Sequence, residues 1–127
     1  MDGIVRVGAC QPPEFIGDPS TALDVMLQFA GEAEGKSVDL LLFPECFLTG
    51  YILSEAYMAD HAYDLKSPPF AAILKRLENV KPVLVFGLGE KKPGKYYNSA
   101  VVVSRGKVMG VYRKTHLIAP NEAFFTP

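Results

Sequence analysis

The sequence predicts a single α/β domain with a mixed β-sheet and flanking helices. Near the N-terminus, an apolar run, an amphipathic segment and a second apolar run follow one another, which is typical of a strand, a helix and a parallel strand. After residue 82 the helical patterns cease, and short apolar runs alternate with turns, which indicates antiparallel hairpins. The 127 residues, 49% of them hydrophobic, suffice for one ordinary domain.

The first half of the chain is expected to form a strand, a helix and a second strand. Residues 3–10 are mostly apolar and end before two prolines, which predicts a buried strand. Asp18 and Pro19 predict a helix start, as an N-cap and a first-turn proline, and the helix is expected to close at Gly35. Residues 38–43 are predicted as the next strand, so a right-handed βαβ crossover is expected. The predicted apolar helix face comprises Leu23, Met26, Leu27 and Ala30.

Two further helices and three further strands are expected. Residues 54–62 can form a short helix, although the periodicity is weak. Ser67 and Pro68 predict the start of a better helix, whose apolar positions recur at i, i+3, i+4 and i+7 from Phe70. Pro82 is expected to end this segment. The strands predicted after it are residues 83–88, 97–103 and 108–112.

Charge and composition exclude several classes of partner. Lys and Arg number 13 against 14 Asp and Glu, so the net charge of −1 gives no electrostatic case for nucleic acid or an anionic membrane. The N-terminus lacks a secretory leader pattern, and no apolar run approaches the ~20 residues of a membrane span. Cys10 and Cys46 do not form a disulfide framework. We therefore expect a cytoplasmic protein that binds neither nucleic acid nor membrane.

No metal or other cofactor is expected. His61 and His116 lack ligand-like spacing to each other or to a second cysteine. Residues 89–95 match the glycine and lysine positions of a phosphate-binding loop, but Tyr96 follows the lysine where a hydroxyl-bearing Ser or Thr is required. A strand is predicted next in place of a helix, so a solvated hairpin is the favoured interpretation.

Two strand ends place charged residues where they can meet. The run at 40–43 ends before Glu45, and the run at 108–112 is followed by Lys114. An ionised carboxylate at the end of a buried strand is either paired or chemically employed, so an ordinary ion pair and a catalytic pair both remain open. Cys46 follows Glu45, and neighbours in an extended segment point to opposite sides, so the two side chains are not expected to face one pocket while the strand geometry lasts. Cys46 and Cys10 are therefore expected to be small buried hydrophobes.

Several short motifs, in this order, resemble the carbon-nitrogen hydrolase (nitrilase) superfamily. They are Gly8-Ala9-Cys10-Gln11, Phe43-Pro44-Glu45 with Thr49-Gly50-Tyr51, Asn98-Ser99-Ala100, and Tyr112-Arg113-Lys114-Thr115-His116-Leu117. Glu122, eight residues beyond Lys114, lies where many amidase-type members carry a second glutamate. The resemblance extends from the first predicted strand to the last residue.

The resemblance implies hydrolysis of a non-peptide amide, carbamoyl or nitrile carbon by a Glu-Lys-Cys mechanism. Glu45 would be the general base for a cysteine, Lys114 would stabilise the oxyanion, and Glu122 would position these groups. The family's nucleophilic cysteine follows the lysine by a few tens of residues, and the chain stops thirteen residues after Lys114. Neither cysteine of this chain takes that place, so the sequence is expected to be the N-terminal half of such an enzyme and inactive alone.

The implied fold is a four-layered α-β-β-α sandwich, of which this chain would supply part. A partial sandwich leaves apolar faces and strand edges without cover, so a homo-oligomer or association with a completing segment is expected. The alternative function is a non-catalytic binding or assembly module of the same fold that pairs with another chain. A structural Glu-Lys pair in an unrelated α/β domain is a third interpretation.

Overall fold

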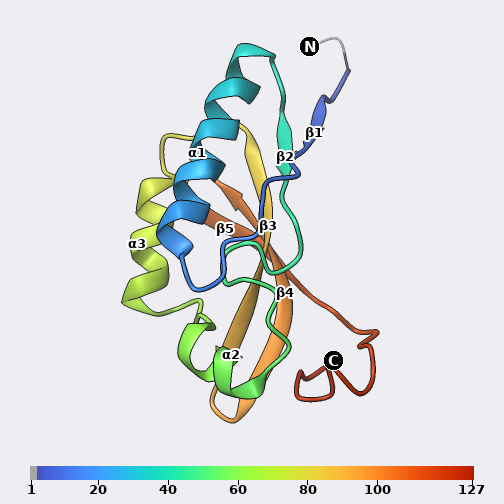
Figure 1. Ribbon diagram of the computed structural model, residues 1–127. Coiled ribbons are helices and arrows are strands. Elements are labelled where there is room, and N and C mark those ends of the chain that lie inside the picture. Colours follow the sequence, from blue (N-terminus) through green and yellow to red (C-terminus); the bar gives the residue numbers. More distant parts are fainter. Residues whose placement is uncertain (1–2) are drawn as a thin grey trace.

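A computed structural model describes residues 3–127. They form one five-stranded mixed sheet with flanking helices (Figure 1). The strands lie in the sheet in chain order: β1 (Val7–Ala9), β2 (Leu40–Leu42), β3 (Val83–Lys92), β4 (Lys95–Ser104) and β5 (Lys107–Arg113). β1, β2 and β3 are parallel, whereas β3, β4 and β5 are antiparallel neighbours. The α/β class with a mixed sheet and flanking helices is therefore confirmed.

The helices begin at the capping residues that the sequence indicated. α1 (Pro19–Gly35) starts after Asp18, whose side chain accepts a hydrogen bond from the Thr21 amide at 3.0 Å. α2 (Glu55–His61) is capped by Ser54, and α3 (Pro68–Arg76) by Ser67. Each cap satisfies an amide of the first turn that has no partner within the helix, which is why helices begin at such residues.

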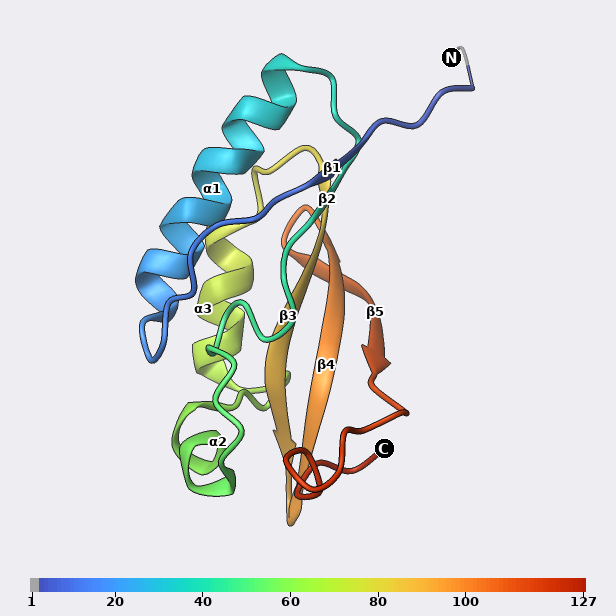
Figure 2. The ribbon, with the colours of Figure 1, turned by 45° about the vertical axis from the view of Figure 1, so that its right-hand side comes forward.

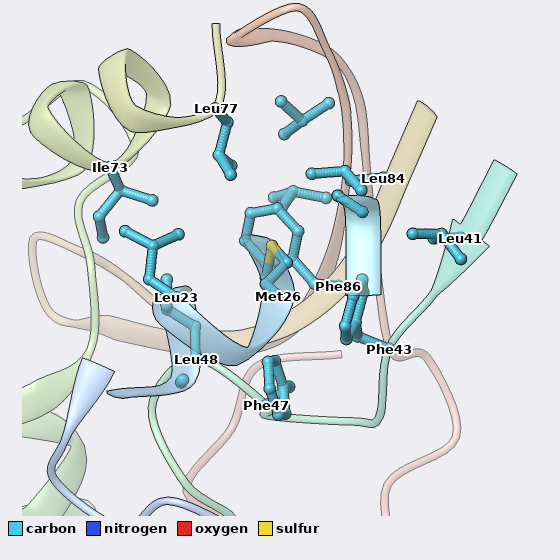
Figure 3. Close-up of a cluster of buried hydrophobic side chains, with 14 of the residues drawn as sticks. Leu23, Met26, Leu41, Phe43, Phe47, Leu48, Ile73, Leu77, Leu84 and Phe86 are labelled. Carbon is cyan, nitrogen blue, oxygen red and sulfur yellow. The ribbon is translucent and has the colours of Figure 1, made fainter. Parts of the chain in front are cut away.

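Two helices cover one face of the sheet. Figure 2 shows α1 and α3 on the same side of the strands, and Figure 3 shows the apolar side chains that fill the space between these layers. Phe86 at the centre of β3 is fully buried, as are Met26 of α1 and Phe70 of α3. Burial of such side chains is the dominant favourable contribution to folding. Leu27, predicted on the buried face of α1, is only partly buried.

The opposite face of the sheet is largely uncovered. The C-terminal segment crosses it at one end (Figure 2). In this segment Phe125 packs with Met58 and Ala62. Elsewhere large apolar side chains remain exposed, including Val7 (57%), Leu42 (40%) and Tyr112 (64%). A one-sided core of this kind leaves an apolar surface that favours further packing.

Strand lengths differ from those predicted. β1 and β2 have three residues each. The expectation of a buried first strand is wrong, because β1 is an edge strand on a sheet face that none of the described residues covers there, and Val7 is exposed. β2 ends early because the chain enters a turn after Pro44 that packs against β3. β3 instead continues past Leu88 to Lys92, where it turns into β4. The expectation of a solvated hairpin at residues 89–95 is therefore only partly right: the turn lies there, but Gly89 and Glu90 are buried in the strand.

Candidate functional site

Glu45 lies in the turn that follows β2, at the edge where the parallel strands end. The turn packs directly against β3: the Leu48 amide donates to the Gly87 carbonyl at 3.0 Å, and a Cβ added at Gly87 would lie 2.3 Å from the backbone nitrogen of Cys46. Only glycine permits this close approach. The turn presents the Glu45 side chain, 45% exposed, towards β4 and the segment that follows β5.

Lys114 joins two carboxylates that are far apart in the sequence. Its ammonium donates hydrogen bonds to Oε1 of Glu45 and to Oε1 of Glu122, each at 3.0 Å. These two interactions, with Glu122 the stronger, raise the pKa of Lys114 above its ordinary value of 10.5. The lysine is therefore fully charged at neutral pH. The structure thus brings together all three residues that the sequence singled out.

Glu122 is completely buried and fully hydrogen-bonded. Its Oε1 accepts from Lys114 and, at 3.2 Å, from the Tyr51 hydroxyl, while its Oε2 accepts from the Ile118 amide at 2.7 Å. Burial opposes ionisation, but the Ile118 amide and the Lys114 ammonium outweigh it and hold the pKa of Glu122 below its ordinary value of 4.5. The cluster therefore carries a buried, fixed negative charge next to the lysine.

Asn98 and Tyr51 belong to the site, although the sequence motifs that contain them gave neither residue a role. The Asn98 amide nitrogen donates to Oε1 of Glu45 at 2.6 Å and lies 3.4 Å from Oε1 of Glu122. Both contacts of Glu45 use one oxygen, so within residues 3–127 its Oε2 makes no hydrogen bond. The available signal for Asn98 was its place, with Ser99, as a polar pair inside a predicted strand whose remaining residues are apolar or aromatic.

Two hollows open beside Glu45. One, of about 280 Å³, is lined by the turn and by the Pro12-Pro13 segment. The other, of about 260 Å³, lies between the turn, the middle of β3 and β4, and the end of β5. The second includes Lys114 and Asn98 in its wall. A mostly apolar hollow with a few converging polar groups is typical of a small-molecule site. Larger hollows, of about 550 and 530 Å³, lie away from this cluster beside Arg113 and His61.

The expected separation of Cys46 from Glu45 is wrong. Strand geometry ends at Leu42, and in the turn both side chains contact Asn98, with the Cys46 sulfur 3.7 Å from its Oδ1. The two residues also border the same hollow. Cys46 is fully buried, and burial together with the Glu45 charge raises the pKa of its thiol to about 12. Such a thiol has almost no thiolate at neutral pH. Cys10 is also buried, with a raised pKa.

The remaining features provide no further evidence for a reactive or metal-binding site within the described residues. His61 stacks on Tyr57 with ring centroids 4.0 Å apart, and its Nδ1 lies 2.9 Å from the Tyr57 carbonyl. Across residues 3–127, no group of three or more His, Cys, Asp or Glu side chains could hold a metal ion. None of the helices described is both long and apolar enough to cross a bilayer.

Fold and site together are typical of an α/β enzyme: a mixed sheet flanked by helices, with carboxylates and an ammonium gathered beside hollows at the strand ends. A family model described as carbon-nitrogen hydrolase matches residues 6–126. The chain belongs to this family, which confirms the resemblance seen in the short motifs.

Individual relatives include amidases and synthetases. The chain is 33% identical over 122 residues to the glutamine-dependent NAD(+) synthetase of Mycobacterium tuberculosis strain H37Rv, covering 96% of this chain and 18% of the synthetase. It is 32% identical over 111 residues to an (R)-stereoselective amidase of a Pseudomonas species, covering 87% of this chain and 40% of the amidase.

A solved amidase structure has the same fold. The amidase of Nesterenkonia sp. AN1, determined after Michael addition of acrylamide at its active site cysteine, superimposes with a TM-score of 0.78 and 25% identity. The match covers 98% of this chain and 50% of the amidase. The chain thus spans half or less of the length of each of these three relatives.

Proposed function

We propose that this chain provides the general base and the oxyanion-stabilising lysine of a hydrolase for small non-peptide amide or carbamoyl compounds, or nitriles. The observation that carries the proposal is the ammonium of Lys114, held at 3.0 Å from both Glu45 and Glu122 beside an open hollow. A fixed cation at a strand end lowers the energy of negative charge that develops on a substrate oxygen or nitrogen.

The three charged residues have different roles in this proposal. Glu45 is 45% exposed and has one oxygen free of hydrogen bonds within residues 3–127, so it can accept a proton from a thiol. Lys114 stabilises the anionic tetrahedral intermediate, and loss of such a donor commonly costs about 10²–10³ in rate. Glu122 is buried and fully bonded, so it positions Lys114 and does not meet the substrate.

We propose that the nucleophile is a cysteine other than Cys10 and Cys46. Nucleophilic attack needs a thiolate that can reach the substrate. Cys46 is fully buried with a thiol pKa of about 12, and Cys10 is buried with a raised pKa. The relation to the Nesterenkonia amidase, which has an active site cysteine and twice the matched length, supports a nucleophile supplied by further sequence or by a second chain. On this proposal residues 1–127 are inactive alone and form part of an α-β-β-α sandwich.

A second candidate function is supported by the uncovered sheet face. Val7, Leu42 and Tyr112 leave apolar surface exposed, and an exposed apolar face of this kind is typical of a surface on which another segment or chain packs. A non-catalytic module that assembles through this face would keep the fold without turnover. For the same reason we expect the 127-residue chain to form oligomers or to need a completing segment.

We place the protein in the cytoplasm, where its two free thiols would stay reduced.

The test is ammonia release from a panel of small amides, carbamoyl compounds and nitriles. The 127-residue chain is compared with a longer form that continues along the reading frame past Pro127, and Glu45→Gln is compared with Glu55→Gln, an exposed glutamate of α2. Turnover by the longer form only, abolished by Glu45→Gln and kept by Glu55→Gln, is the expected result. Turnover by the short chain would overturn the assignment of the nucleophile, and no turnover by either would favour the assembly module.

A further inference from the structure

A second ion pair lies on the helix-covered side of the sheet, behind the proposed site. Arg113 donates from Nε to Oε2 of Glu90 at 2.9 Å and from Nη2 to Oε1 at 2.6 Å. Glu90 is 1% exposed and also accepts a hydrogen bond from the Ser99 hydroxyl at 2.8 Å. The guanidinium lies over the Tyr97 ring, 4.1 Å from its centroid. Both carboxylate oxygens are therefore paired by a two-pronged donor, the strongest form of this interaction.

This ion pair connects three neighbouring strands. Glu90 lies in β3, Ser99 and Tyr97 lie in β4, and Arg113 is the last residue of β5. Within residues 3–127, β5 is hydrogen-bonded as a strand to β4 only, so it is an edge strand. The end of an edge strand opens easily unless side chains hold it. Arg113 holds it by reaching across β4 to a buried carboxylate of β3.

The Arg113 ion pair and Lys114 lie on opposite faces of the sheet, because their side chains alternate along the strand. Successive residues of an extended chain point to opposite sides, so Arg113 meets Glu90 on the helix-covered side while Lys114 meets Glu45 and Glu122 on the other. The Lys114 amide donates to the Asn98 carbonyl at 2.8 Å, so pairing with β4 continues one residue past the strand. We propose that Arg113, through its ion pair with Glu90, is a positioning residue that fixes the backbone from which Lys114 reaches both carboxylates.

The charge state of Glu90 fits this role. Burial opposes its ionisation, but the hydrogen bonds from Arg113 and Ser99 outweigh burial and hold its pKa below the ordinary value of 4.5. Both partners of the ion pair, the Glu90 carboxylate and the Arg113 guanidinium, are therefore charged throughout the neutral pH range. A misplacement of about 1 Å in a catalytic group can cost about 100-fold in rate, so a fixed strand end matters for the lysine that follows it.

The role is tested by the chemical reactivity of Lys114, which requires no turnover. The proposal rests on the catalytic function proposed for Lys114, but its positional part can be measured on the 127-residue chain. Trace acetic anhydride is added at a series of pH values, and mass spectrometry gives the labelling of each lysine relative to exposed Lys75. The variants are Arg113→Gln, Arg113→Lys and, as the matched control, Lys107→Gln at the other end of β5.

The sign of the change separates positioning from simple charge removal. Loss of a neighbouring cation alone would raise the pKa of Lys114 and lower its reactivity. Loss of position frees Lys114 from its two carboxylates, lowers its pKa and raises the free-amine fraction about tenfold for each unit. We expect a rise of about tenfold in Arg113→Gln, a smaller rise in Arg113→Lys, and a change of less than about twofold in Lys107→Gln.

Unchanged or reduced labelling of Lys114 in folded Arg113→Gln would overturn the proposal, even if the variant melts at a lower temperature. If Arg113→Gln does not fold, Arg113→Lys decides: a rise of about threefold supports the proposal and no rise overturns it. In an active longer form, Arg113→Lys should lower kcat and leave KM within about twofold. Absence of turnover in every form would contradict the proposed function and leave the labelling result intact.

Discussion

Two clusters, each made of a cation and its carboxylate partners, lie on opposite faces of the sheet where β5 ends. They differ in how completely the carboxylate oxygens are hydrogen-bonded. On the helix-covered side, Glu90 is 1% exposed and both of its oxygens are bonded by Arg113. On the other side, Lys114 is shared between Glu122, which is fully buried, and Glu45, which is 45% exposed. The first cluster is closed in that its carboxylate is buried and paired through both oxygens, although Arg113 itself is 35% exposed beside a hollow. The second cluster is open, because Glu45 lies at a hollow and one of its oxygens makes no hydrogen bond within residues 3–127.

This difference separates a structural ion pair from a reactive one. A buried carboxylate that is paired with a guanidinium through both oxygens can fix a strand but is a poor proton acceptor for a ligand. A carboxylate with a free oxygen beside a charged lysine can do so, because solvent and substrate reach it. Adjacent residues, Arg113 and Lys114, thus perform different tasks on the two faces of one strand.

The largest effect is expected from breaking the closed cluster. Arg113→Met leaves Glu90 buried without its cation, which should lower the free energy of unfolding by about 3 kcal/mol. Adding Glu90→Leu removes the stranded carboxylate and should restore most of the loss. Denaturant titration of the two single variants and the double variant measures this cycle, with Lys107→Met as the control. A double variant no more stable than Arg113→Met would contradict the closed-pair interpretation.

An intermediate effect should distinguish the two carboxylates of the open cluster. Glu122→Gln removes a buried charge that accepts hydrogen bonds from Lys114 and the Ile118 amide, and should cost about 2 kcal/mol in unfolding free energy. Glu45→Gln alters a half-exposed partner and should cost less than about 1 kcal/mol. The same denaturant titration gives the free energy of unfolding of both variants. Equal losses would show that Glu45 contributes as much to stability as Glu122 and would contradict the distinction between the two carboxylates.

Changing the pH perturbs the charges and leaves every side chain in place. Glu90 and Glu122 have pKa values below 4.5 in the folded chain, so their stabilisation is present above that pH and is lost as the pH falls through the lowered values. Lys114 has a pKa above 10.5, so its contribution is present below pH 10.5 and is lost as the pH rises further. The pKa of the Cys46 thiol is raised from 9.0 to about 12 by burial, so its contribution is present below about pH 9 and is lost as the unfolded thiol ionises above it. Melting temperature against pH should therefore be level between about 5 and 8 and should fall on both sides. In Glu122→Gln the acid fall should be smaller, and the alkaline fall should lose the part that comes from Lys114 and keep the part that comes from Cys46.

The smallest effect is expected at Cys46. Its thiol is fully buried, with a pKa of about 12, so iodoacetamide at pH 8 should not alkylate it in the folded chain. After denaturation both cysteines should react, which provides the control. Rapid alkylation of native Cys46 would mean that the open cluster contains its own accessible thiol, and the proposed division between the chain and an external nucleophile would have to be abandoned.

The sequence by itself determined the elements and the pair of charged residues at two strand ends. Capping residues such as Asp18 and Ser67 act on the amides next to them, and apolar periodicity depends only on local spacing, so helices and strands could be located without a structure. The link between Glu45 and Lys114 also followed, because parallel and antiparallel strands bring defined ends to one edge.

Only the tertiary structure decided which polar residues are buried, and with what partners. Asn98 bridges Glu45 and Glu122, and Glu90 turns from a presumed hairpin residue into a buried ion-pair partner, because β3 continues to Lys92. The turn that carries Glu45 and Cys46 packs against β3 only because Gly87 lets the two backbone segments touch. Contacts of this kind join residues tens of positions apart, and their energies depend on burial, which no local pattern encodes.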